Sequence, residues 1–329
     1  MSVTSSASTA GGGPARLSTP DPRGYRPHPL HDPARNYPET NCWSDVIIEL
    51  LHARGYEPLA AFAHLVRIDF EGDQWTFFKP PADDLEALFG VDVHEMQPYR
   101  PLPTQIAEQL ALGRSMIVEV DSWFLPDLAA SSYRSEHVKT AIAADAIDPE
   151  RQVLRYFHGP GRYELEGEDY RGALRLGRWA PEALPPYAEL VRFDAGPRLE
   201  GEELRRESER TLRRHLGRRP AGSPFERFAA ALERALPTLL AGDLAGYHAY
   251  AFATVRMLGS ACEVLASYCE WLLGARGAAA ATALIEVVEA SKALSFRLAR
   301  RRAFEPRPAL EGMARSWERA LGAIEGALD

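Results

Sequence analysis

The stretch that decides the fold is Tyr37-Pro38-Glu39-Thr40-Asn41-Cys42-Trp43, which leads directly into the apolar stripe of a predicted helix. Apolar residues recur at helical spacing after it, and Gly55 ends the pattern. The cysteine therefore falls on the first turn, where unpaired backbone N–H groups and the helix dipole favour a thiolate. A cysteine at a helix start, followed by a histidine that opens a later strand, is typical of the papain-like nucleophile fold.

His137 is the histidine that fits this pattern. It directly precedes a strand predicted over 138–143, and the start of a strand gives a general base a rigid position. Taken alone, His137 would be interpreted as a surface residue that caps a loop, but its pairing with Cys42 favours the role of base. For Cys42 the alternative is a buried structural thiol, because free cysteine is among the most buried residue types.

The third, orienting residue of such a site is left open by the sequence. In papain-like sheets it usually lies on the strand after the histidine. That strand is predicted over 153–157, and His158 and Gly159 stand at its end in place of an Asp or Asn. Asp121, which ends a strand predicted over 115–120, is the geometric alternative. The candidate catalytic residues are thus Cys42, His137, His158 and Asp121.

Substrate-binding residues are predicted from two segments. An oxyanion hole needs the Cys42 backbone N–H and a side-chain amide, for which Asn41 or Asn36 is available. Asn41 serves equally well as the N-cap of the helix. The segment 69–79 is rich in acids and aromatic residues and could line a substrate groove, although a hairpin with one aromatic face is the simpler interpretation. The candidates taken from it are Asp73, Gln74 and Trp75.

The remaining pattern predicts an α+β fold: a papain-like (cysteine peptidase-like) domain followed by an all-α helical bundle. In the first half we expect strands at 65–70, 74–78 and 92–96, a turn at 71–73, and helices at 83–89 and 103–112. Strands disappear from residue 202 onward, where the predicted helices are 202–217, 224–240, 243–274, 278–302 and 309–327. The expected domains are a disordered lead at 1–36, the α+β domain at 37–200 and the helical domain at 201–329.

Composition limits the class of protein. A chain of 329 residues with 46% hydrophobic residues can bury a sizeable core, and its net charge of −8 argues against nucleic acid or anionic membrane as the main partner. Three cysteines are too few for a disulfide framework and indicate a reducing, cytoplasmic setting. Cys262 and Cys269 fit core packing and, without nearby His or Asp, predict no metal site. No apolar run approaches the roughly 20 residues of a membrane span.

Four segments carry a resemblance to known proteins: residues 37–42, 70–79, 117–121 and 137–140. Together they resemble an uncharacterised bacterial domain-of-unknown-function family, whose members are often encoded beside amino-acid:carrier-protein ligases and acyl carrier proteins. More distantly, the first half resembles the N-terminal domain of butirosin biosynthesis protein H, a papain-like acyltransferase. That resemblance implies that Cys42 receives an aminoacyl group from a carrier protein's phosphopantetheine thioester, with His137 as base and then as acid.

Three functions follow as hypotheses. The first is a cysteine-dependent acyltransferase that moves an aminoacyl group from a carrier protein to a small-molecule acceptor and holds no bound cofactor. The second is a papain-like thioesterase or amidase that uses the same residues for hydrolysis. The third is a non-catalytic module that binds a carrier protein, in which Cys42 is only structural. A reactive Cys42 favours either enzyme, and acceptor-dependent product separates transfer from hydrolysis.

Overall fold

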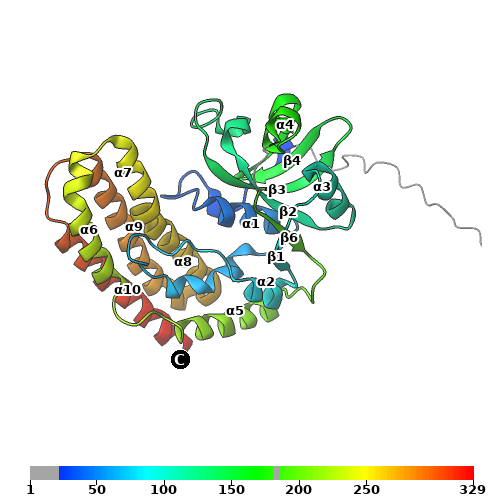
Figure 1. The fold of residues 1–329 in the computed structure, drawn as a ribbon. Coiled ribbons are helices and arrows are strands. Elements are labelled where there is room, and N and C mark those ends of the chain that lie inside the picture. Colours follow the sequence, from blue (N-terminus) through cyan, green and yellow to red (C-terminus); the bar gives the residue numbers. More distant parts are fainter. Residues whose placement is uncertain (1–21, 181–184) are drawn as a thin grey trace, which may run out of the picture.

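The computed structural model describes residues 22–180 and 185–329 of the chain. Its first region is built on a six-stranded sheet with the order β1-β6-β2-β3-β4-β5, in which every neighbouring pair is antiparallel (Figure 1). The strands are β1 Asp92–Met96, β2 Ser115–Asp121, β3 Lys139–Asp148, β4 Val153–His158, β5 Gly161–Glu166 and β6 Ala188–Arg192.

Helices cover both faces of this sheet. Helix α1 (Cys42–His52) packs on one face against β3 and β4, whereas α3 (Leu102–Ala111) and α4 (Gly167–Ala173) pack on the other (Figure 1). Side chains alternate along β3: Ala141 and Ala143 join the cluster beneath α1, whereas Ile142 and Ala144 join the opposite cluster. This alternation assigns each side chain at the end of the sheet to one face.

Helix α1 forms where its sequence predicts. The Asn41 side chain caps it by accepting the Ser44 N–H at 3.0 Å. Its apolar positions are fully buried against the sheet, Val46, Ile47 and Leu50 among them. Gly55 follows the helix with φ of +75°, a conformation that favours glycine.

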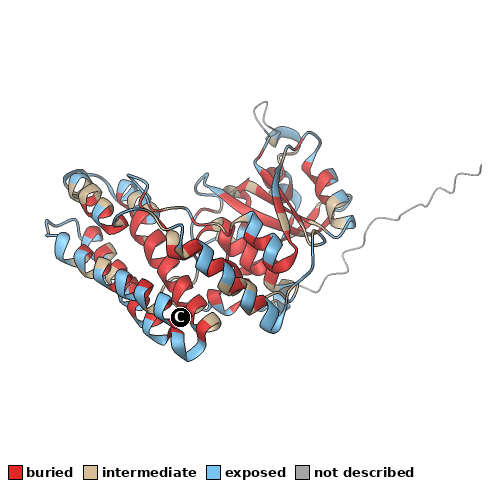
Figure 2. Ribbon diagram, turned by 90° about the horizontal axis from the view of Figure 1, so that it is seen from below, coloured by how far each residue is buried: buried red, intermediate tan, exposed pale blue. Residues whose placement is uncertain are grey.

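The second region is helical and shares one hydrophobic core. Its helices are α5 Gly201–Leu216, α6 Pro224–Ala241, α7 Leu244–Ala251, α8 Met257–Leu273, α9 Ala278–Ala299 and α10 Arg307–Leu328, and a π-helical turn, Phe252–Arg256, joins α7 to α8. Buried residues follow the inner sides of these helices and the strands, and exposed residues lie outside (Figure 2). The prediction of helices over this half is confirmed, with the expected helix 243–274 divided at the π-helical turn.

The predicted strands at 65–70 and 74–78 are wrong. Residues Pro58–Arg67 form a 3₁₀-helix, and the only pairing described nearby is an isolated bridge between Phe70 and Trp75 across the predicted turn. The rings of Phe70, Trp75 and Phe78 enter the core of the helical region instead of a sheet, and Trp75, 2% exposed, packs against Phe225 and Phe228. Burial on all sides produces an apolar run that resembles a strand in sequence. Helix α2 (Ala82–Phe89) follows as predicted, whereas β5, α4 and β6 were not predicted.

The expected disorder of the lead is wrong for residues 22–36, and residues 1–21 lie outside the described part of the chain. Short 3₁₀-helices form at Pro22–Gly24 and Pro29–His31, and His31 is buried. The segment stays ordered because its polar groups find partners in both regions, including Glu263 of α8, which accepts the Asn36 and Tyr37 N–H groups. It is therefore part of the folded protein.

Within the described residues, one helical stretch, Leu244–Ala299, has the length and apolar composition of a membrane span. In its most apolar window 44% of the residues are buried inside the protein, among the core side chains of α8 and α9. Core helices of soluble proteins meet the same criteria, so this stretch is weak support for a membrane span.

Candidate functional site

A cavity of about 430 Å³ lies where α1 begins, β3 begins and β4 ends. The loop before β3 forms one wall, and the π-helical turn of the second region reaches the same cavity through Phe252 and Arg256. Its lining includes Glu39, Thr40, Asn41, Cys42, Asp45, Phe77, Ser122, Asp127, Leu128, Ser132, Val138, Lys139, Thr140, His158, Gly159, Pro160 and Tyr163. Both regions of the chain thus build this site.

Cys42 is the first residue of α1 and is partly exposed to this cavity. Burial raises the pKa of its thiol, whereas the charge of Lys139 and the backbone N–H of Ala141 act to lower that pKa. Lys139 is itself held by Glu119 at 2.9 Å. In the register of β2 and β3, Glu119 is opposite Ala141, so Glu119, Ala141 and Lys139 share the face beneath α1. The thiol therefore faces an ammonium–carboxylate pair.

His158, the last residue of β4, supplies the imidazole that lines the cavity. Its Nδ1 lies 2.5 Å from Asp127 Oδ2 and its Nε2 lies 2.9 Å from the Thr140 hydroxyl. Because a carboxylate only accepts, Nδ1 carries the hydrogen and Nε2 accepts the hydrogen of the hydroxyl. Tyr156 donates to the other oxygen of Asp127. The order hydroxyl, imidazole, carboxylate is that of a serine-hydrolase relay.

His137 is placed elsewhere. Its Nδ1 lies 2.6 Å from Asp121 Oδ2, and its ring stacks on Trp123 with centroids 4.5 Å apart. Its side chain is 66% exposed, and His137 does not appear among the described residues that line the cavity. The structure therefore joins His137 to Asp121 and places Cys42 and His158 in the lining of one cavity, and among the described residues no hydrogen bond links Cys42 to His137.

The predicted substrate-binding residues lie in three different places: at the N-cap of α1, on an exposed turn and in the core of the helical region. Asn41 caps α1 through its Oδ1 and donates its amide hydrogens to Phe78 O at 3.1 Å and Ser44 Oγ at 3.2 Å. Asn36 Oδ1 accepts from Lys292. Asp73 and Gln74 are exposed on the turn, and Trp75 lies in the core. From this segment it is Phe77, 42% exposed, that reaches the cavity.

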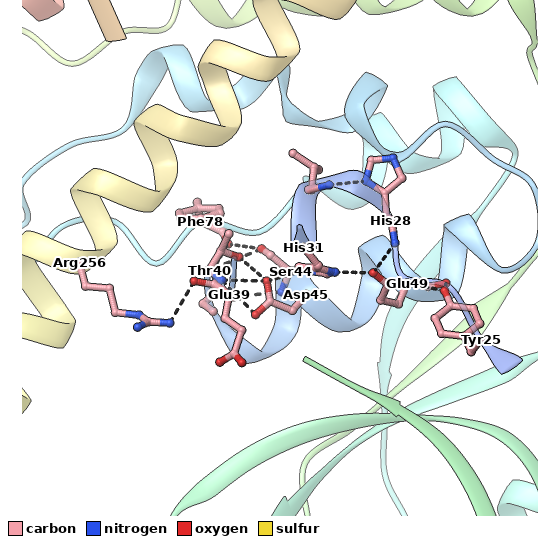
Figure 3. A network of polar contacts seen from close by, with 12 residues as sticks. Tyr25, His28, His31, Glu39, Thr40, Ser44, Asp45, Glu49, Phe78 and Arg256 are labelled. Atoms are coloured by element: carbon pink, nitrogen blue, oxygen red, sulfur yellow. Dashed lines mark hydrogen bonds and ion pairs between the residues drawn. The ribbon is translucent and has the colours of Figure 1, made fainter. Parts of the chain in front are cut away.

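A buried ion cluster holds the loop before Cys42 in place (Figure 3). His31 lies between Glu49 and Asp45, with its Nε2 3.3 Å from Asp45 Oδ1. Asp45 in turn accepts the Thr40 N–H and the Thr40 hydroxyl, the latter at 2.7 Å. Burial alone would lower the pKa of His31, but hydrogen bonds and charges from Asp45 and Glu49 outweigh it and raise the pKa to about 9. His31 is therefore a cation at neutral pH.

Four functional candidates escaped the sequence analysis: Asp127, Thr140, Lys139 and His31. Asp127 lies on the short 3₁₀-helix Pro126–Leu128, where no periodic pattern marks it. Thr140 and Lys139 look like ordinary strand residues, and His31 fell in the expected lead. For Lys139 and Thr140 a signal was present, because both lie in the segment 137–140 that carries the family resemblance.

Family models match nearly all of the described chain. Residues 26–193 match the DUF1839 N-terminal domain and residues 201–326 match the DUF1839 C-terminal domain. None of the curated proteins matches the chain. The resemblance to an uncharacterised family is thereby confirmed. The chain belongs to the DUF1839 family, a family of domains of unknown function.

Proposed function

We propose that this protein is a cysteine-dependent acyltransferase, in which Cys42 takes an acyl group from a carrier-protein thioester and passes it to a small acceptor. The observation that carries the proposal is the position of Cys42 at the N-terminus of α1, open to a cavity that also holds the His158–Asp127 pair. Acyl transfer requires a thiol whose thiolate is stabilised, here by the helix dipole, and a base such as an imidazole paired with a carboxylate.

The arrangement of elements supports a papain-like assignment. A helix that begins with the cysteine packs on an antiparallel sheet, and His158, at the end of β4, lines the same cavity as that cysteine. The resemblance to the acyltransferase domain of butirosin biosynthesis protein H supports the aminoacyl group and the carrier protein in the proposal. The acyl group then arrives on the carrier's phosphopantetheine, in a cytoplasmic setting.

The first half-reaction is a thioester exchange. Cys42 loses its proton to solvent and its thiolate attacks the carbonyl carbon of the incoming thioester. The new C–S bond forms, the bond to the carrier's sulfur breaks, and the departing thiolate takes a proton from solvent. Lys139 favours the Cys42 thiolate by its charge, and backbone N–H groups of the first turn of α1 face the developing oxyanion.

Intact-mass spectrometry tests this function. After incubation with an aminoacyl-loaded carrier protein, we expect a covalent adduct of the acyl mass on the wild-type chain and none on Cys42→Ala. Cys262→Ala is the matched control. Cys262 is buried in the helical core, so this variant should form the same adduct as the wild type. An absent wild-type adduct, together with a Cys42 that iodoacetamide does not alkylate at neutral pH, would refute the acyltransferase. Acyl-enzyme that breaks down equally with and without acceptor would assign hydrolysis instead.

A further inference from the structure

Cys42 and His158 reach the shared cavity from opposite faces of the sheet. Beneath α1 lie Lys139 and Ala141, next to the thiol. In the ladder of β3 and β4, Ala143 is opposite Phe157, and both belong to the cluster on that same face. Alternation therefore turns the next residue, His158, toward the other face, where Thr140 is found.

Hydrogen bonding gives the two groups different neighbours. His158 Nε2 is bonded to the Thr140 hydroxyl and not to a thiol, and Asp127 fixes the opposite nitrogen. Cys42 has the Ala141 N–H and the charge of Lys139 beside it. His158 and Asp127 are 9% and 3% exposed, so their geometry is held by packing. An imidazole placed in this way is prepared to accept a hydrogen from a hydroxyl group.

We propose that the site is divided, with Cys42 and Lys139 holding the acyl group and His158 acting as the general base for the hydroxyl group of a small acceptor alcohol. This inference rests on the proposed acyltransferase function. The acceptor hydroxyl takes the place of the Thr140 hydroxyl at His158 Nε2, and Thr140 therefore marks where the acceptor oxygen lies. Asp127 then stabilises the imidazolium that forms.

The second half-reaction balances without another reagent. The acceptor oxygen attacks the carbonyl carbon of acyl-Cys42 while its proton passes to His158 Nε2. The new C–O bond forms, the C–S bond breaks, and its electron pair stays on sulfur as a thiolate beside Lys139. The imidazolium releases its proton to solvent, and the thiolate is ready for the next thioester. The exposed apolar side chains Phe77, Val138 and Phe252 surround the mouth and give the acceptor's carbon skeleton a surface to contact.

Separating the half-reactions tests the division. Acetyl-Cys42 is prepared with S-acetyl pantetheine as donor, its formation is followed by quenched intact mass, and its breakdown is then measured with methanol as the probe alcohol. We expect His158→Gln to form acetyl-enzyme within about 3-fold of the wild-type rate and to lose about 100-fold in breakdown, the usual contribution of a general base. We expect Asp127→Asn to slow the breakdown of acetyl-Cys42 as well, and to slow its formation much less. His94→Gln is the matched control, because His94 forms an exposed pair with Asp92 on β1, outside the cavity.

The outcomes distinguish this inference from the function beneath it. If His158→Gln slows formation as much as breakdown, His158 serves the thiol and the divided site is refuted. Equal rates of acetyl-enzyme breakdown in the wild type and both variants also refute the divided site. Faster transfer of the acetyl group to methylamine than to methanol would refute an alcohol as the acceptor and indicate an amine instead. If the wild-type protein forms no acetyl-enzyme at all, the acyltransferase function itself is refuted. Circular dichroism and the unfolding midpoint of each variant show whether it is folded.

Discussion

Raising the pH removes a charge from the ion cluster that supports the Cys42 loop. His31 is 3% exposed and lies between Asp45 and Glu49, which raise its pKa to about 9. In the unfolded chain its ordinary pKa is 6.5. A group whose pKa is higher in the folded state stabilises the fold fully below the unfolded pKa, and this contribution is lost as the pH rises through the folded pKa.

The expected loss of stability is large for a single side chain. The difference between a pKa of about 9 and one of 6.5 corresponds to about 3 kcal/mol, at about 1.4 kcal/mol per pH unit. Nearly all of it disappears between about pH 6.5 and about pH 10. The lowered pKa of Glu49 acts in the opposite, acidic range, where its stabilisation is lost as the carboxylate is protonated. Below about pH 8.5 the alkaline loss is that of His31, whereas near pH 9 the buried thiols of Cys262 and Cys269, whose pKa values burial raises, begin to add to it.

Urea unfolding at a series of pH values measures this loss. The wild-type free energy of unfolding should fall by about 3 kcal/mol between pH 6.5 and about pH 9.5–10. His31→Gln, whose side chain has no charge to lose, should start lower and lose about 3 kcal/mol less than the wild type over that range. A wild-type profile that is flat there, or a slope that is unchanged in His31→Gln, would show that His31 is not the buried cation described. His94→Gln should keep the wild-type slope.

Three further changes test other parts of the structure. Lys139→Ala should raise the pKa of Cys42 further, because it removes a positive charge that lowers this pKa. The pH profile of Cys42 alkylation by iodoacetamide should therefore move to higher pH. An unchanged profile would show that Lys139 does not influence the thiol. Trp75→Ala should cost about 3–5 kcal/mol in urea unfolding, since it empties an aromatic position in the helical core. Gly90→Ala should cost at least about 1 kcal/mol, because Gly90 has φ of +64° and a Cβ there would overlap Gly196 O; a neutral result in the same assay would contradict this close approach.

Local sequence signals were sufficient to predict the helices whose apolar residues recur regularly and whose ends carry capping residues, glycine or proline. The cap at Asn41 and the apolar stripe after Cys42 predicted α1, and glycine and proline residues between Ala- and Leu-rich segments predicted the helices of the second half. The segment 65–78 was mispredicted because most of its apolar residues, Phe77 excepted, are buried by tertiary packing on all sides, which removes any period. Order at His31 was missed for a related reason, since its partners Asp45 and Glu49 belong to a helix that follows later in the chain.

The choice between the two histidines depends on burial, which a strand-end pattern does not contain. His137 and His158 both lie next to strand ends, and each has a carboxylate within hydrogen-bond distance of Nδ1. His137 precedes the first ladder residue of β3 by two positions, so its ring leaves the sheet, and solvent screens its pair with Asp121. The pair of His158 is enclosed, where the same charges interact more strongly and fix the tautomer. An enclosed imidazole with a fixed tautomer can act as a directed base, and this is why the geometry favours His158.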